Sequence, residues 1–261
     1  MLIVDGHEDI AWNVLTHGRD YTHSALWLRR RENNTSIPSE SGHTLLGKCE
    51  WLLGHVGVIF ATLFVSPARH RSGSWDTQVY TTPHEAYRLA TAQLDFYHRL
   101  IDEHPQFRLI GDKSALEEVV ATWVDGLSLS ERRIGLLPLM EGADPILEPE
   151  QAGEWFEQGV RIIGLAWEST RYAGGTHEPG SLTTEGRRLL EVMASLNMVL
   201  DLSHLAEESY YQAIEYYPGV VIASHSNPRR FLPTSRGLSD DMIAMLAERD
   251  GIVGIVHTMP F

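Results

Sequence analysis

The 261-residue sequence has a single cysteine, Cys49, so no internal disulfide can form, and this fits a reducing compartment. Positive charge is also scarce, because 21 lysines and arginines stand against 35 acidic residues and the formal net charge is −14. Nucleic acids and anionic membrane surfaces are bound through clustered lysines and arginines, so both are unfavoured as partners. We expect a cytoplasmic protein with no nucleic-acid or membrane partner.

Long apolar runs and phosphate-binding turns are missing as well. No stretch approaches the roughly 20 apolar residues of a membrane span, and no signal-like segment precedes His7. The stretch Ala173-Gly174-Gly175-Thr176 lacks the G-x-G-x-x-G spacing of a dinucleotide site. What the chain does have is 43% apolar residues, enough for one α/β barrel or two smaller domains.

Short apolar runs alternate with longer amphipathic segments. We expect strands at residues 2–7, 55–64, 134–141, 160–167, 198–204, 220–225 and 252–257. We expect helices at residues 83–102, 114–124 with Ser114 as N-cap, 150–158, 184–195, 206–216 and 239–250. The irregular stretches 20–44, with a short helix, and 66–82 are predicted surface excursions rather than domain linkers.

This alternation favours a parallel sheet, and with no phosphate turn it predicts a TIM-type (β/α)8 barrel rather than a doubly wound sheet. We predict one barrel domain over residues 1–261, with about seven of the eight strands. An open barrel would leave two buried strand edges unpaired, so we expect the domain to be incomplete at its C-terminal end.

Potential metal ligands stand at the ends of four predicted strands. His7 and Asp9 are two residues apart and point to one face, and Glu141, His204 and His225 each follow an apolar run. The carboxyl ends of barrel strands meet at one mouth, where imidazole and carboxylate groups can bind zinc, manganese or iron. A lone histidine at a strand end is usually structural, so the prediction rests on the coincidence of positions.

Six segments together resemble the successive motifs of the membrane (renal) dipeptidase family of zinc peptidases, in the family's order. They are Asp5-Gly6-His7-Glu8-Asp9, Met140-Glu141-Gly142, Gly159-Val160-Arg161, Leu182-Thr183-Thr184-Glu185-Gly186-Arg187, Asp201-Leu202-Ser203-His204 and Ala223-Ser224-His225-Ser226-Asn227. The resemblance implies a (β/α)8 barrel with two divalent metal ions, most simply zinc. It also implies a small dipeptide as substrate, a soluble bacterial type of member and a possible homodimer.

The resemblance also implies roles for individual residues. His7 and Asp9 are expected to bind one ion, His204 and His225 the other, and Glu141 both. Arg236 stands where the family has an arginine that grips the substrate carboxylate, which suits a guanidinium.

Two departures from the family pattern affect catalysis. Trp167 stands where the family has a histidine that faces the scissile bond, so its indole N–H, or Arg171, Tyr172 or His177 in the next loop, is expected to contact substrate. The family also supplies an aspartate from an eighth strand, and no such residue follows the seventh predicted strand here.

The resemblance implies a zinc-dependent dipeptidase that hydrolyses small dipeptides with a metal-bridged hydroxide, with Glu141, Trp167 and Arg236 as catalytic residues. Two alternatives stay open. The chain is a metal-binding but catalytically impaired barrel, or it is a binuclear amidohydrolase for another small amide or lactone. Related hydrolases bridge their metals with a carbamylated lysine, but Lys48 and Lys113 are the only lysines and neither ends a predicted strand.

Overall fold

The computed structural model describes residues 1–257, which form two compact units. Unit 1 contains residues 1–81 and 89–138, and unit 2 contains residues 82–88 and those from 139 onward. Helix α5 (Pro83–Glu103) and strand β6 (Ile134–Glu141) belong in part to each unit. The last four residues of the predicted single domain lie outside the described part of the chain.

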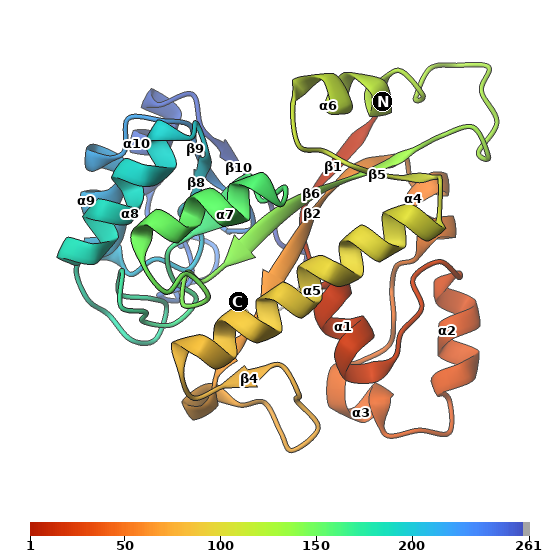
Figure 1. Cartoon of the computed structure of the whole chain (residues 1–261), viewed down its shortest axis with the longest axis horizontal. Coiled ribbons are helices and arrows are strands. Elements are labelled where there is room, and N and C mark those ends of the chain that lie inside the picture. The colour runs from red at the N-terminus through yellow and green to blue at the C-terminus, as the bar shows by residue number, and fades with distance from the viewer. Residues whose placement is uncertain (258–261) are drawn as a thin grey trace. The chain divides into compact units, whose positions relative to one another are not determined.

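Unit 1 contains parallel strands together with helices (Figure 1). Its elements are β1 (Ile3–Glu8), α1 (Ile10–His17), α2 (Ala25–Glu32), α3 (Ile37–Ser41), α4 (Lys48–Leu53), β2 (Val56–Phe64), β3 (Ser66–Pro67), β4 (Val79–Tyr80), β5 (Phe107–Leu109) and α6 (Lys113–Val120). Strand β1 pairs in parallel with β2, and β5 pairs in parallel with the first residues of β6.

Strand β2 is largely buried. Its run Val-Gly-Val-Ile-Phe-Ala-Thr-Leu-Phe alternates too little to leave a polar face, as expected for a parallel strand covered on both sides. Helices α1, α4 and α6 pack against β2. One core cluster in this unit joins Val58, Ile110 and Val119, and each fully buried side chain of this kind contributes about 1.5–3 kcal/mol.

Unit 2 continues the parallel pattern from the last residues of β6. Its further elements are α7 (Ala152–Glu157), β7 (Ile162–Gly164), α8 (Thr184–Ser195), β8 (Val199–Asp201), α9 (Glu207–Tyr216), β9 (Val221–Ala223), α10 (Asp240–Glu248) and β10 (Ile252–Val253). The strands pair in the order β6-β7-β8-β9-β10, and every pair is parallel.

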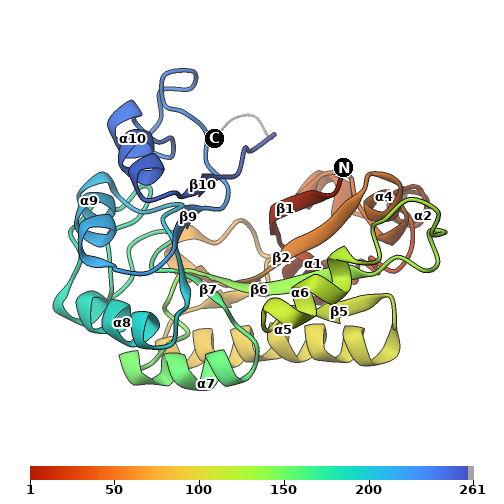
Figure 2. The ribbon, with the colours of Figure 1, turned by 90° about the horizontal axis from the view of Figure 1, so that it is seen from above.

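The helices of unit 2 pack in chain order, α7 on α8, α8 on α9 and α9 on α10 (Figure 2). Local sequence sets where they begin. Thr183 accepts a hydrogen bond from the backbone N–H of Gly186 at the start of α8, and Ser239 accepts one from Met242 at the start of α10. Such side-chain caps satisfy backbone donors that have no partner inside the helix.

The parallel strands with intervening helices confirm the predicted α/β class and are consistent with a TIM-type barrel. Strand β6 and helix α8 have the predicted bounds, whereas β7 to β10 are shorter than predicted. The prediction for α6 was wrong at its start, because Asp112 rather than Ser114 is the N-cap and accepts from the N–H of Ala115 at 2.8 Å.

Several elements of unit 1 were not predicted. Helix α1 was missed, and the excursion 20–44 holds two short helices, α2 and α3, instead of one. Strand β5 was also missed, since its three residues are too few to show a period. Among residues 1–257, no helix combines the length and the apolar character needed to cross a membrane.

Candidate metal centre and substrate pocket

Three predicted ligands of unit 2 stand at one edge of its strands. Glu141 is the last residue of β6 and pairs with Gly164, which in turn pairs with Asp201 at the end of β8. His204 follows β8 by three residues and His225 follows β9 by two. Because parallel strands in register end at one level, the fold itself brings the three side chains to one place.

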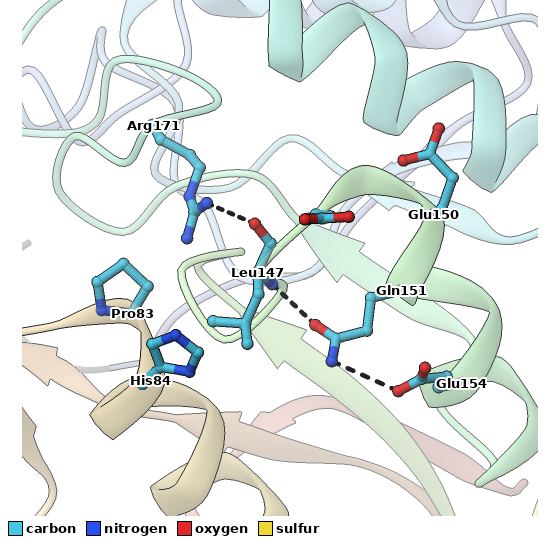
Figure 3. A pocket seen from close by; sticks show the side chains of 8 residues that line it. Pro83, His84, Leu147, Glu150, Gln151, Glu154 and Arg171 are labelled. Carbon is cyan, nitrogen blue, oxygen red and sulfur yellow. Dashed lines mark hydrogen bonds between the residues drawn. The ribbon is translucent and has the colours of Figure 1, made fainter.

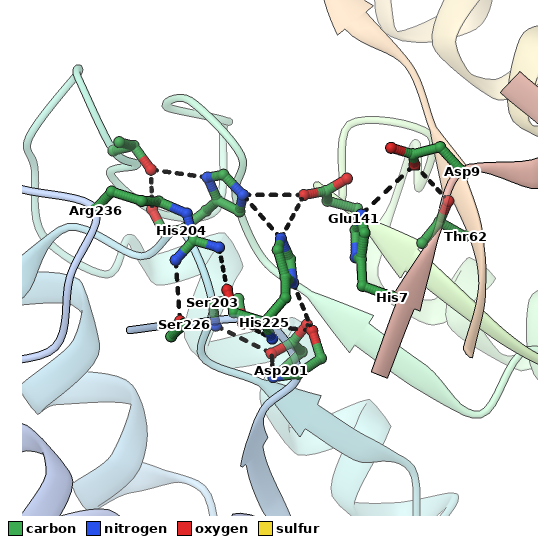
Figure 4. A network of polar contacts seen from close by, with 12 residues as sticks. His7, Asp9, Thr62, Glu141, Asp201, Ser203, His204, His225, Ser226 and Arg236 are labelled. Carbon is green, nitrogen blue, oxygen red and sulfur yellow. Dashed lines mark hydrogen bonds and ion pairs between the residues drawn. The ribbon is translucent and has the colours of Figure 1, made fainter. Parts of the chain in front are cut away.

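These three side chains converge on a single point (Figure 4). Glu141 Oε1 lies 3.1 Å from His204 Nε2 and 3.2 Å from His225 Nε2. The two Nε2 atoms lie 3.0 Å apart. Glu141 and His204 are buried and His225 is partly buried. One carboxylate oxygen and two imidazole nitrogens therefore face one another within this unit.

The hydrogen bonds behind His225 determine which ring nitrogen carries its proton. Its Nδ1 lies 2.8 Å from Ser224 Oγ, and the Ser224 hydroxyl donates its only proton to the carboxylate of Asp201. Ser224 must therefore accept from Nδ1–H, so the neutral ring directs the lone pair of Nε2 toward Glu141. This is the arrangement that orients a histidine as a metal ligand.

His204 is held in the same way by Thr176. Its Nδ1 lies 2.9 Å from Thr176 Oγ1, and that hydroxyl lies 3.3 Å from the backbone carbonyl of His204, to which it donates. Nδ1 of His204 then carries the proton, and its Nε2 lone pair also points toward Glu141. The His204 backbone has a φ of 65°, a left-handed conformation that is costly for a residue with a side chain and is concentrated at functional sites.

Burial keeps the His204 imidazole neutral. It is the largest cause that holds the pKa of His204 well below its ordinary value, and the positive charge of Arg236 adds to it, while Glu141 acts in the opposite direction. A neutral imidazole is the form that binds metal. Two nitrogen lone pairs and a carboxylate oxygen directed at one another are a donor set that fits a divalent cation.

Asp201 organises this site from behind. Its Oδ1 accepts from the backbone N–H groups of Ser203 at 3.0 Å and Ser224 at 2.9 Å, and its Oδ2 accepts from the Ser224 hydroxyl. The backbone N–H of His225 donates to Ser203 Oγ at 3.2 Å. Asp201 and Ser203 therefore fix the backbone that carries both histidines.

A cavity of about 240 Å³ adjoins His204. Its lining residues are Trp167, Glu168, Thr176, His177, His204, Thr234, Ser235 and Arg236. The Trp167 ring lies 6.2 Å from the His204 ring between centroids. Trp167 therefore stands beside a predicted ligand, on the wall of the cavity.

Arg236 is buried in this wall and anchored by its terminal nitrogens. Nη1 donates to Ser226 Oγ at 2.9 Å and Nη2 donates to the carbonyl of His225. Burial lowers the pKa of Arg236 to about 10, and Glu141 and Asp201 act against this, so the side chain stays charged at neutral pH. Within residues 1–257, Nε of Arg236 and the Thr234 hydroxyl are buried without a hydrogen-bond partner, so this cavity offers donors for a polar ligand.

In unit 1, His7 and Asp9 share one face of the chain at the end of β1, as their spacing predicts. His7 Nε2 lies 3.6 Å from Asp9 Oδ1, and Asp9 Oδ1 lies 2.5 Å from the Thr62 hydroxyl (Figure 4). Thr62 is held in turn by Tyr97, whose hydroxyl donates to the Thr62 carbonyl at 3.0 Å. The Asp9 carboxylate is thus positioned by strand β2 and helix α5.

Glu8 lies between these two residues in sequence but is buried. Its Oε1 accepts from the indole N–H of Trp51 at 2.8 Å. Burial is the largest cause that raises the pKa of Glu8 well above its ordinary value, and the neighbouring Asp5 adds to it. Glu8 therefore serves the packing of unit 1 while its two neighbours are the candidate ligands.

Arg171 and Tyr172 do not line the cavity beside His204. Arg171 lines another cavity, of about 540 Å³, and donates to the carbonyl of Leu147 at 2.5 Å (Figure 3). Burial raises the pKa of Tyr172 to about 12, and its hydroxyl donates to the carbonyl of Ile146 at 2.6 Å. Their role in substrate binding stays a prediction.

Sequence reasoning missed Thr62, Thr176, Ser224 and Glu168. The first three orient candidate ligands through hydroxyl groups, and Glu168 lines the cavity. Ser224 stands next to His225 within a motif, so its position was visible, but Thr62 and Thr176 lie 53 and 28 residues from their partners. No local sequence pattern predicts a contact between residues so far apart.

Comparison with known proteins gives consistent results. The family model described as "Membrane dipeptidase (Peptidase family M19)" matches residues 1–261. A protein of Acinetobacter calcoaceticus, the "Uncharacterized protein in PQQ-III 3'region", is 25% identical over 99% of this chain and 81% of its own length. "Dipeptidase 3" of Mus musculus is 27% identical over 69% of this chain, and the match spans only 36% of that relative.

A solved structure has the same fold. It is a metallo peptidase from Rhodobacter sphaeroides, liganded with a phosphinate mimic of the dipeptide L-Ala-D-Ala. The TM-score is 0.74 at 23% sequence identity, over 98% of this chain and 73% of that one.

Proposed function

The chain belongs to the membrane dipeptidase family, peptidase family M19, and we propose that it is a metal-dependent hydrolase that cleaves the peptide bond of small dipeptides. The observation that carries this proposal is the convergence of Glu141 Oε1 with the Nε2 atoms of His204 and His225. The three donor atoms lie about 3 Å from one another. A hydroxyl group orients each imidazole from its far side. This arrangement supports a cation site.

We propose Glu141, His204 and His225 as ligands of one divalent ion. The family resemblance assigns His7 and Asp9 of unit 1 to a second ion. We propose zinc for both ions, since imidazole and carboxylate are ligands that zinc accepts. Divalent ions held by these residues would polarise a carbonyl and lower the pKa of a bound water toward neutrality.

The residues around the candidate metal ligands have the chemistry that a dipeptide requires. We propose that the buried guanidinium of Arg236 binds the substrate carboxylate, because it is charged and lines the cavity beside His204. Trp167 is proposed to contact the substrate from the same wall. Arg171 and Tyr172 are kept as candidates for contacts farther from the scissile bond.

Two other features of the protein are also proposals. The single cysteine supports a reducing compartment such as the cytoplasm. The family resemblance supports a homodimer.

Metal analysis followed by an activity assay tests the proposal. We expect the purified chain to bind divalent metal, to hydrolyse dipeptides such as L-Ala-D-Ala, and to lose activity on chelation and regain it with zinc. Bound metal without hydrolysis would favour the impaired barrel. Chelator-sensitive hydrolysis of a lactone or another amide, but not of dipeptides, would favour the amidohydrolase.

A further inference from the structure

The loop between β7 and α8 carries a carboxylate–imidazole pair, Glu168 and His177. Neither residue is among the proposed metal ligands. His177 Nδ1 lies 2.6 Å from Glu168 Oε1, and the backbone N–H of His177 donates to Glu168 Oε2 at 2.8 Å. The Glu168 side chain is 2% exposed, whereas that of His177 is 69% exposed. A buried anion therefore holds an imidazole that stands open to solvent.

This pairing fixes the orientation of the ring. Both oxygens of Glu168 bind groups of His177, one the backbone and one the ring, so Nδ1 carries a proton directed at the carboxylate. Nε2 is then the ring nitrogen that does not contact Glu168, on a side chain that is largely exposed. An imidazole oriented through Nδ1 with an accessible Nε2 is suited to give or take a proton.

The backbone at Gly175 approaches the backbone at Glu168 closely. A Cβ on Gly175 would lie 2.4 Å from the carbonyl carbon of Glu168, so only glycine permits this approach. The N–H of Thr176 donates to the carbonyl of Trp167 at 3.1 Å, and the N–H of Gly175 donates to the backbone carbonyl of Glu178 at 3.0 Å. The segment that carries His177 is thereby fixed beside the segment that carries Glu168.

The same segment connects this pair to the candidate metal centre. Thr176 binds the ring of His204, and the next residue, His177, lines the cavity of about 240 Å³ that His204 and Arg236 also line. Within the described part of unit 2, the charged and titratable groups near His177 include Glu168 at its ring, His204 and Arg236 on the cavity wall, and Glu178, which accepts from the Ser169 hydroxyl in the same loop.

We propose that His177 is a catalytic residue that protonates the leaving amine of the dipeptide, with Glu168 as its positioning residue. This rests on the proposed dipeptidase function. In that function Arg236 binds the substrate carboxylate, which belongs to the amino acid that leaves. A group that shares a cavity with Arg236 therefore faces the leaving half of the substrate, where the amine needs a proton.

The step balances in atoms and electrons. The oxygen of the attacking water bonds to the carbonyl carbon, and the C–N bond breaks with its electron pair on nitrogen. That nitrogen takes the Nε2 proton of the His177 imidazolium, while Nδ1 keeps its proton and its hydrogen bond to the Glu168 carboxylate. The proton that the water releases passes to solvent, from which the exposed His177 ring is protonated again.

Two variants and a control test this role in the metal-loaded chain. We expect H177Q to lower kcat by about 10²-fold or more, as for the loss of a general acid, and to change KM less than about threefold. We expect E168Q to lower kcat less, because the imidazole stays in place and only the negatively charged acceptor that orients it is lost. H43Q, which changes an exposed histidine of unit 1, should match the wild type.

A measurement without turnover supplements the kinetics. In ¹⁵N NMR spectra, the signals that are absent from H177Q identify the His177 ring of the wild type. At a pH where that ring is neutral, we expect these signals to show the proton on Nδ1. E168Q should lose this tautomer preference. A wild-type ring protonated at Nε2 instead would overturn the proposed orientation.

The outcomes also separate this inference from the function on which it rests. Dipeptide hydrolysis by the wild type with an unchanged kcat in H177Q would overturn the role of His177 and leave the dipeptidase function in place. A wild-type chain that binds metal but hydrolyses no dipeptide would overturn both. A rise in KM with unchanged kcat in H177Q would make His177 a binding residue and overturn proton donation.

Discussion

Asp201 binds Ser224 twice, through the backbone N–H at 2.9 Å and through the hydroxyl. The second bond fixes the Ser224 oxygen as the acceptor for His225 Nδ1 and so sets the tautomer of a candidate ligand. We expect D201N to weaken zinc binding about 10–100-fold, the usual effect of losing a partner that orients a ligand. Calorimetric titration of the apo protein measures this, with D125N on an exposed loop as control. Equal affinities in both variants would show that Asp201 does not support the metal centre.

Glu141 contributes the one negatively charged donor of the convergent set in unit 2. We expect E141Q to reduce metal content and to lower kcat/KM by more than the roughly 10–100-fold typical of a lost supporting partner. Elemental analysis and a dipeptide assay check both effects. E248Q, on the exposed part of α10 in the same unit, is the matched control. A fully metallated and active E141Q would remove Glu141 from the site.

Gly175 and Gly153 differ in the space around them. A Cβ on Gly175 meets the Glu168 backbone at 2.4 Å, whereas one on Gly153, in α7, meets nothing within 4 Å. We expect G175A to lower the free energy of unfolding by about 1–3 kcal/mol, because the loop must shift to admit the methyl group. G153A is expected to be neutral or to stabilise by up to about 1 kcal/mol. Urea denaturation of both variants provides the comparison, and equal midpoints would contradict it.

Arg19 and Glu32 form a buried ion pair in unit 1. Arg19 Nε donates to Glu32 Oε1 at 2.9 Å and Nη2 donates to Oε2 at 3.2 Å, with both side chains 4% exposed. We expect R19M to destabilise the protein by about 3–5 kcal/mol, because it leaves a buried carboxylate without its counter-charge. The double variant R19M/E32M should be destabilised less than R19M alone. Additive losses in thermal denaturation would rule out this explanation.

His17 lies against the rings of Trp12 and Trp75, and its side chain is 2% exposed. Burial is the largest cause that lowers the pKa of His17 below its ordinary value, and Arg19 adds to it. The carboxylates that oppose this shift are those of Glu40, Glu32 and Asp76.

A lowered pKa in the folded state means that the unfolded chain binds more protons as the pH falls through about 6.5, so the contribution of His17 to the free energy of unfolding decreases there. We expect H17F, which keeps an aromatic ring, to be less sensitive to pH between about 7 and 5 than the wild type. Chemical denaturation at several pH values measures this, with H43F as the exposed-histidine control. Parallel curves for H17F and the wild type would contradict the assignment.

The sequence predicted the elements whose signal is local. The eight residues of β6 form an unbroken apolar run that ends in Glu141, and α8 has apolar residues at helical spacing behind a threonine cap. Both were predicted at their observed bounds. Strand β5 and helix α1 were missed because three and eight residues show too little period to separate them from loops.

Contacts between segments that are distant in the sequence were the second kind of feature that could not be predicted. Asp201 and Ser224 are 23 residues apart, and Glu168 and His177 are paired across an irregular loop with no period. Such pairs arise only when the register of neighbouring strands and the path of a loop are known. Ligand types at strand ends were therefore predictable, whereas the hydroxyl and carboxylate groups that orient them were not.

The number of residues in strand β6 determines the face of the strand on which the Glu141 side chain lies. Successive side chains of a strand point to opposite faces, so one residue inserted anywhere in the run Ile134–Glu141 would turn the carboxylate away from His204 and His225. An insertion in the connection 121–133, before the strand, would leave the number of residues in β6 unchanged. Chain-length variation among natural relatives should therefore collect in the connection and spare the eight residues of the strand.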